Sequence, residues 1–195
     1  MIRDTRLAIL ETAKKLFNER GYTNVSTRDI ADELSISKGN LTYYFKKKEE
    51  IIEAILLESP SPRILKAPEN LAELNDFFND IQMTVQENAF YFWHHAQLIQ
   101  ISSKIKEMQN DILQKNIEFM TQAFKTLTSE GILRDENSPG EYDRIVDAVL
   151  ITSIYWIPFC KLKGEETPNS FSEQVWGILS SFLTAKGQIE FQKTI

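Results

Sequence analysis

The sequence predicts an all-α protein of about nine helices, because apolar residues recur at helical spacing along most of the chain. Only 7 glycines and 6 prolines occur in the 195 residues, and no glycine stands between Gly39 and Gly131. Strand-rich domains need frequent turn residues, so this scarcity favours long helices. The lack of closely spaced glycines also argues against the phosphate-binding loops of nucleotide-binding α/β enzymes.

The composition is that of a globular protein, with 42% hydrophobic and 26% charged residues. The single cysteine, Cys160, excludes an internal disulfide and fits a reducing compartment. The most apolar window, residues 145–160, is interrupted by Asp147 and Pro158 and is too short to span a bilayer comfortably. The N-terminus is amphipathic rather than a signal peptide. We therefore expect a soluble, cytoplasmic protein that contacts no membrane.

Two helices are predicted at the start of the chain. The first begins at Asp4 or Thr5 and stops before Gly21, a residue type that is favourable just after a helix end. The second begins with a capping box, in which the side chains of Ser26 and Asp29 each accept a hydrogen bond from the other's backbone amide.

A third helix follows after a short break. Residues 35–37 interrupt the pattern, and Ser37 can cap a helix over Lys38–Phe45. Leu41 and Phe45 point inward on this helix and are predicted core residues. A short helix, a tight turn and a second short helix form a helix-turn-helix, whose second helix enters the major groove of DNA.

A fourth helix is predicted directly after the three lysines at residues 46–48, and five further helices follow it. Pro60, Pro62 and Pro68 mark residues 58–68 as a hinge or linker. We expect a domain at residues 1–48 and a larger helical domain at residues 49–195. The predicted helices beyond the third span residues 49–57, 69–87, 88–103, 105–130, 141–163 and 171–185.

Charge is unevenly distributed along the chain. The net charge is −6, which alone counts against a nucleic-acid partner. Residues 1–57 hold ten Lys/Arg and nine Asp/Glu, for +1, whereas residues 58–195 hold twelve and nineteen, for −7. Residues 37–48 contain four lysines and no acid. Because salt screens distant charges beyond about 10 Å, this local patch fits phosphate contact. A solvated lysine face is the alternative.

Three segments near the start of the chain form a specific set: Ala13–Phe17 followed by Gly21-Tyr22, Ser26–Ala31, and Ser37–Phe45 followed by Lys48. With this set, the first 50 or so residues resemble the DNA-binding domain of the tetracycline-repressor (TetR) family. The resemblance implies a three-helix DNA-binding head, joined by a fourth helix to a helical body that dimerises through its last two long helices. A small effector bound in the body would then move the two heads out of operator spacing.

Some positions depart from the family pattern. Ser35 stands where a glycine is frequent, and Thr42 stands where an aromatic residue is common. Lys46-Lys47 replaces a more typical Pro-Ser pair. None of these changes removes the motif, but Thr42 lies on the recognition helix and can alter the sequence that is read.

Ten residues are predicted to contact DNA, with solvated surface side chains as the alternative. Asn40 can make a bidentate contact to adenine and Lys38 a contact to guanine, while Thr42 can pack on a thymine methyl or bond a phosphate. Gly39 lets the backbone approach DNA closely. Tyr44 is open to either a DNA or a core role. The full set is Thr27, Arg28, Ser37, Lys38, Gly39, Asn40, Thr42, Tyr43, Tyr44 and Lys48, of which Thr27, Arg28, Tyr43 and Lys48 are assigned to phosphates.

The helical body is rich in aromatic residues. Residues 90–95 are all aromatic, and a helix turns by about 100° per residue, so this run cannot face one way. An effector cavity and a well-filled aromatic core are equally open explanations. The candidate pocket residues are Phe77, Phe78, Ile81, Trp93, His94, Phe119, Met120 and Tyr155.

Homodimerisation is predicted because the helix at residues 141–163 is apolar on too many sides to be covered within one small domain. His94 and His95 point to different sides of a helix and cannot chelate one ion, so we expect no metal and no other cofactor. The candidate dimer residues are Ile151, Ile154, Val175, Ile178, Leu179 and Phe182.

These observations favour a dimeric transcriptional regulator, a repressor that binds a palindromic operator in double-stranded DNA and responds to a small effector of unknown identity. One alternative is a DNA-binding protein of the same fold that is regulated by a protein partner or not at all. An all-α enzyme is the other alternative, but no catalytic set of residues is evident.

Overall fold

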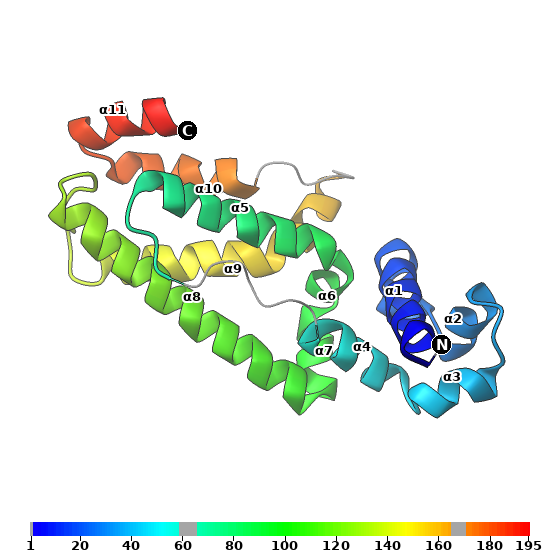
Figure 1. Ribbon diagram of the computed structural model, residues 1–195. Helices are drawn as coiled ribbons and strands as arrows, with labels where there is room; N and C mark the ends of the chain where they lie inside the picture. The colour runs from blue at the N-terminus through cyan, green and yellow to red at the C-terminus, as the bar shows by residue number, and fades with distance from the viewer. Residues whose placement is uncertain (1, 59–65, 165–170) are drawn as a thin grey trace. The chain divides into compact units, whose positions relative to one another are not determined.

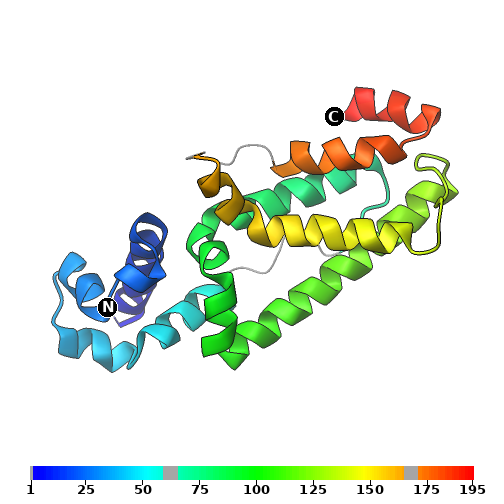
Figure 2. The ribbon, with the colours of Figure 1, turned by 180° about the vertical axis from the view of Figure 1, so that it is seen from behind.

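A computed structural model describes residues 2–58, 66–164 and 171–195. Those ranges contain eleven α-helices, two 3-10 helices and no strand, so the predicted all-α class is confirmed (Figures 1 and 2). The predicted linker at residues 58–68 lies mostly outside the described residues. The chain divides into two packing units: unit 1 consists of Met1–Ser61 with Asn88–Asn110, and unit 2 of Pro62–Glu87 with Asp111–Ile195.

Unit 1 surrounds one apolar core. Helix α1 contacts α2, α4 and α6, and its buried side chains Ile9, Ala13 and Phe17 lie at helical spacing. Helices α3 and α4 agree with the predicted bounds to within one residue, and α1 ends before Gly21 as predicted. Helix α1 begins earlier than predicted, at Ile2, so Asp4 and Thr5 lie inside it and do not cap it. The unit contains α1 (Ile2–Arg20), α2 (Thr27–Glu33), α3 (Lys38–Tyr44), α4 (Lys48–Leu57), α6 (Ala89–Trp93), α7 (His95–Ile101) and the first turns of α8 (Ser103–Ser129).

The aromatic segment differs from the single helix predicted over residues 88–103. It forms two helices, α6 and α7, that meet at His94, whose backbone angles of φ −111° and ψ 15° leave the helical region. Phe90, Tyr91 and Leu98 are buried in the core of unit 1. Their separations of one, seven and eight residues also fit one continuous helix, so periodicity alone misses the break.

Unit 2 is a group of longer helices around α5. Helix α5 contacts α9, α10 and α11, and Figures 1 and 2 both show α10 alongside α5. Phe78 of α5 is buried, and its ring contacts that of Trp176 of α10 edge to face. The unit contains α5 (Leu71–Glu87), the remainder of α8, α9 (Glu141–Leu162), α10 (Phe171–Leu179) and α11 (Ala185–Thr194).

The C-terminal segment departs from prediction in two ways. The predicted helix over residues 171–185 ends at Leu179, and a further helix, α11, begins after Thr184. The Thr184 hydroxyl accepts the Gly187 amide at 3.1 Å and donates to the Gly131 carbonyl at 2.6 Å. Helix α11 is therefore capped and held to the loop after α8 by the same side chain.

Three predicted dimer residues are core residues instead. Val175, Leu179 and Phe182 are buried within this single chain. Side chains already packed inside unit 2 expose almost no area to a second chain, so the structure removes them from the candidate interface. Ile154 and Ile178 are half-buried, and Ile151 is exposed.

Helix α9 is the one helix in the described ranges that is long and apolar enough to cross a membrane by length and composition. Its most apolar 18-residue window has a mean hydropathy of 1.6, so the expectation that this segment is too short was wrong. Length and composition alone are weak evidence for a membrane span, because a core helix of a soluble protein shares them. In this chain, 39% of that window is buried. Contacts with α5 and α10 account for the buried part.

Candidate nucleic-acid interface

The start of α2 is fixed by the predicted capping box. The Ser26 Oγ accepts the Asp29 amide at 3.2 Å, and an Asp29 carboxylate oxygen accepts the Ser26 amide at 2.7 Å. The Ser26 hydroxyl also donates to this carboxylate at 2.6 Å, and this bond, followed by the one from the Ser26 amide, holds the pKa of the Asp29 carboxyl below its usual value. The prediction of this helix start is confirmed.

The turn between α2 and α3 depends on Ser35. Its φ of 54° is left-handed, the region that favours glycine, so the serine is strained where the family pattern has a frequent glycine. The Ile36 amide donates to the Ala31 carbonyl at 3.0 Å, and Ala31 is buried. This tight turn sets the direction in which α3 leaves α2.

Helix α3 separates a buried face from an exposed one. Leu41 and Phe45 are buried, as predicted, whereas the Ser37 Oγ caps the helix by accepting the Asn40 amide at 3.1 Å. Tyr43 is 79% exposed, so its hydroxyl is free to reach a partner molecule. Five of the predicted DNA contacts lie on the exposed side: Lys38, Gly39, Asn40, Thr42 and Tyr43.

The other predicted contacts are more constrained. Arg28 is exposed and lies 3.7 Å from Asp32 in a loose surface pair, which leaves it available for phosphate. Thr27 is half-buried at the first turn of α2. Tyr44 is half-buried, and its ring meets that of Tyr43 edge to face at 5.2 Å. Whether Tyr44 contacts DNA or belongs to the core therefore stays open.

Lys48 is the residue whose surroundings the sequence did not indicate. Its Nζ donates to the carbonyls of Tyr22 and Val25, both at 2.8 Å, and lies 4.1 Å from the centre of the Tyr22 ring. Burial lowers the pKa of Lys48 and raises the pKa of Tyr22 to about 12, the latter with help from Glu49. Most of the hydrogen-bonding capacity of this ammonium group is therefore used inside the chain.

Comparison with known proteins decides the family. The family model described as "Bacterial regulatory proteins, tetR family" matches residues 9–55, and the model described as "Bacterial transcriptional repressor" matches residues 54–191. Together they cover nearly all of the chain. The chain belongs to the TetR family. It is accordingly a DNA-binding transcriptional regulator with a helix-turn-helix.

Individual TetR-family relatives are distant but match over nearly their whole length. The HTH-type transcriptional regulator UidR of Escherichia coli K12 is 23% identical over 189 residues, which are 93% of this chain and 94% of that protein. A TetR-family transcriptional regulator from Marinobacter aquaeolei VT8 has a TM-score of 0.78 at 22% identity, over 93% of this chain and 92% of that one. These similarities establish the fold and the class of protein.

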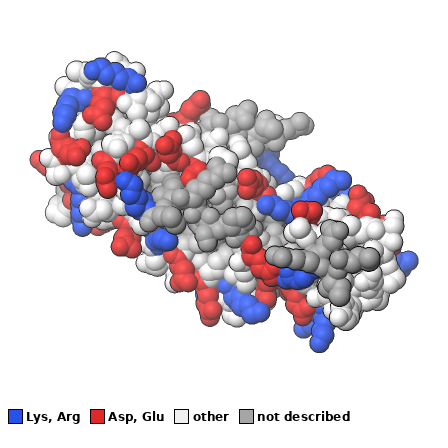
Figure 3. Space-filling model, in the orientation of Figure 1, with Lys and Arg blue, Asp and Glu red and all other residues white. Residues whose placement is uncertain are grey.

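A third relative was solved with a small molecule. A regulator from Saccharomonospora viridis in complex with choline has a TM-score of 0.66 at 22% identity, over 93% of this chain and 98% of that one. In the present TetR-family chain, acidic and basic side chains are interspersed over the face seen in Figure 3.

The eight predicted effector-pocket residues do not all lie in one unit. Trp93 and His94 belong to unit 1, and the other six to unit 2. Within unit 2, Phe77, Phe78 and Met120 are buried, whereas Tyr155 is 54% exposed. The rings of Phe77 and Phe78 contact each other edge to face at 5.9 Å, as expected of a filled aromatic core. Ile81 and Phe119 are half-buried. The pocket stays a prediction.

Proposed function

We propose that this TetR-family protein is a homodimeric repressor that acts in the cytoplasm and binds a palindromic operator. The exposed face of α3 supports this proposal most directly. Lys38, Asn40 and Tyr43 stand on a capped helix whose opposite side is buried, so the chain presents hydrogen-bonding groups outward on a rigid element. Each well-placed bidentate base contact supplies about 1–3 kcal/mol of discrimination.

An apolar stripe on α9 supports the homodimer. Ile151, Tyr155, Phe159 and Leu162 are 59%, 54%, 52% and 84% exposed. Their spacing of four, four and three residues puts them on one face of the helix. A continuous exposed stripe of large apolar side chains marks an interaction surface, and a second copy of the same helix covers it symmetrically. We therefore assign Tyr155 to this stripe, and the half-buried Ile154 and Ile178 stay predicted dimer residues.

Two-fold symmetry of the dimer determines the form of the operator. Two α3 helices related by a two-fold axis read the same sequence on opposite strands, so the operator is a palindrome with half-sites about one or more helical turns apart. A ligand changes the affinity for DNA if it binds the dimer more tightly at one separation of the two DNA-binding heads than at another. DNA then changes the affinity for that ligand by the same factor. We propose that unit 2 binds such an effector, and the relative in complex with choline supports a small-molecule ligand.

DNA footprinting upstream of the protein's own gene tests the proposal. We expect protection of one palindromic segment at protein concentrations that leave random duplex unprotected. The Asn40→Ala variant should lose preference at one base pair per half-site, while Tyr43→Phe should weaken binding to all sequences about equally. Equal binding of the wild type to every duplex, with no ranking among operator variants, would contradict the proposed function.

A further inference from the structure

Two lysines, Lys46 and Lys47, connect the recognition helix α3 to α4. Both side chains are exposed, and Lys46 directly follows Phe45, the residue that ends α3. Within the described part of the chain, neither ammonium group has a hydrogen-bond or ion-pair partner. We propose that Lys46 and Lys47 contact DNA backbone phosphates beside the bases that α3 reads, and that Lys48 is a positioning residue for this site. The proposal rests on DNA binding through α3.

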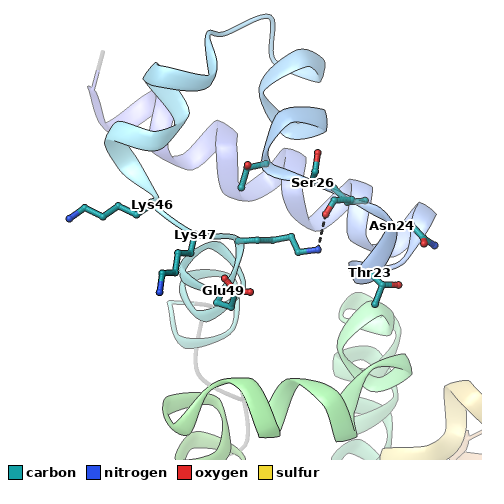
Figure 4. Close-up of a pocket in the computed structure, with 9 residues that line it drawn as sticks. Thr23, Asn24, Ser26, Lys46, Lys47 and Glu49 are labelled. Atoms are coloured by element: carbon teal, nitrogen blue, oxygen red, sulfur yellow. Dashed lines mark hydrogen bonds between the residues drawn. The ribbon is translucent and has the colours of Figure 1, made fainter.

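The lysines border an open hollow of about 430 Å³ within unit 1. In Figure 4, Lys46 and Lys47 stand on one side of the opening, and Thr23, Asn24 and Ser26 lie across from them. Polar side chains of these kinds donate hydrogen bonds to phosphate oxygens in protein–DNA complexes. The hollow is lined by Thr23, Asn24, Val25, Ser26, Thr27, Lys46, Lys47, Lys48 and Glu49.

The acidic residues beside the lysines are occupied by the chain itself. A Glu50 carboxylate oxygen accepts the backbone amide of Lys46 at 2.7 Å. Glu49 lines the hollow, but its carboxylate interacts with the hydroxyl of Tyr22 and contributes to raising the pKa of that tyrosine. These carboxylates therefore stabilise the α3–α4 connection without pairing with either lysine side chain.

Lys48 differs from its two neighbours although all three have the same charge. Its ammonium group bonds the carbonyls of Tyr22 and Val25, 26 and 23 residues earlier in the chain. Those carbonyls belong to the segment that leads into α2. Lys48 thus holds the start of α4 against residues 22–25, on the side of the hollow opposite Lys46 and Lys47. It affects DNA binding by positioning that side, and not by contacting a phosphate itself.

The position of the lysine pair along α3 identifies phosphate as the contacted group. In a helix-turn-helix, the N-terminal residues of the recognition helix contact base edges. Residues just beyond its C-terminal end lie nearer the edge of the groove, where the sugar–phosphate backbone runs. Two exposed, unpaired ammonium groups fit the negative charges of that backbone, and each neutralised phosphate releases counterions. A phosphate contact is therefore measurable from salt dependence.

The experiment titrates full-length protein with a fluorescent duplex of random sequence at several salt concentrations. The variants are Lys46→Ala, Lys47→Ala, their double variant and Lys48→Met. Lys106→Ala is the matched control, because Lys106 is an exposed lysine of the same unit that does not line the hollow. Each lost phosphate contact lowers the slope of log affinity against log salt by about 0.9. Raising salt from about 50 to 200 mM should then weaken a single variant about 3.5-fold less than the wild type, and the double variant about 12-fold less.

Lys48→Met should behave differently. It should lower affinity by a similar factor at every salt concentration, giving a line parallel to that of the wild type, and lower the melting temperature because two carbonyls lose their donor. Slopes of the Lys46 and Lys47 variants equal to that of Lys106→Ala would overturn the proposal, and so would a slope loss confined to Lys48→Met. Failure of the proposed function is a separate result, since it appears as a wild type without preference for any palindrome over the random duplex.

Discussion

Substitution of Gly39 by alanine separates what the fold requires from what DNA requires. Gly39 lies in the first turn of α3 with an ordinary negative φ, and a Cβ built there meets only the Ser37 Oγ, at 3.8 Å. That is van der Waals contact, so the chain itself has room for alanine. Replacing glycine by alanine within a helix stabilises a protein by about 0.5–1 kcal/mol. For a chain of this size, the expected rise in melting temperature is about 1–4 °C.

DNA binding should change in the opposite direction. If the backbone at Gly39 approaches the duplex, an added methyl group pushes the start of α3 away and weakens the contacts of Lys38 and Asn40. Losing one base contact of about 1–3 kcal/mol corresponds to an affinity loss of about 5-fold to 140-fold. The prediction is therefore a variant that is more stable and yet binds its operator more weakly.

The assay combines thermal unfolding with operator binding at fixed salt. Gly177→Ala calibrates the stability gain, because Gly177 lies in α10 and a Cβ there meets nothing within 4 Å. Both variants should unfold at a higher temperature than the wild type. An unchanged operator affinity for Gly39→Ala would refute the close approach of this backbone to DNA, and a lower melting temperature would show that the folded chain has no room for a methyl group there.

Three further predictions concern unit 2. In Gly187→Ala, the new Cβ overlaps the carbonyl oxygen of Ile132, so we expect a loss of about 1–3 kcal/mol in urea unfolding, and a wild-type midpoint would contradict it. Arg134 lowers the pKa of Glu141 to about 2, so the stabilisation from this ion pair is present above the pKa of the unfolded chain, near 4.5, and is lost as pH falls toward 2. Glu141→Gln should therefore flatten the dependence of melting temperature on pH across that range. An unaltered pH profile would count against the ion pair. Ile151→Glu places charge on the exposed stripe of α9 and should convert dimer to monomer in light scattering, whereas a stable dimer would exclude this face.

The N-terminal helices could be predicted because their boundaries depend on local hydrogen bonds. Ser26 and Asp29 are three residues apart, as are Ser37 and Asn40, and each pair forms the bond that its spacing predicts. The buried side chains of α1 likewise follow the helical period. Such features need no knowledge of the rest of the chain, so sequence alone specifies them and places the exposed face of α3.

Features that depend on distant partners could not be predicted. Nothing near Lys48 in the sequence indicates that its acceptors are the carbonyls of Tyr22 and Val25. The predicted dimer residues Val175 and Leu179 are a second example, because helical periodicity shows that a face is covered but not by which chain. Packing against α5 decided the matter, since Val175 and Leu179 are buried within unit 2.

The contacts of α4 explain why residues 88–110 belong to the same unit as the N-terminal helices. At the N-terminus of α4, the Lys48 ammonium donates hydrogen bonds to the segment before α2. Further along the helix, one Glu53 carboxylate oxygen accepts the Ser102 hydroxyl at 2.6 Å, and the other lies 3.0 Å from the Lys104 ammonium. Ser102 is buried, and its hydrogen bond, followed by Lys104, holds the pKa of Glu53 below its usual value. Because breaking either contact leaves buried polar groups unpaired, α4 is bound both to the DNA-reading helices and to residues 88–110. The domain boundary expected after residue 48 stays a prediction, and it falls at the start of α4, whose contacts named here all lie within unit 1.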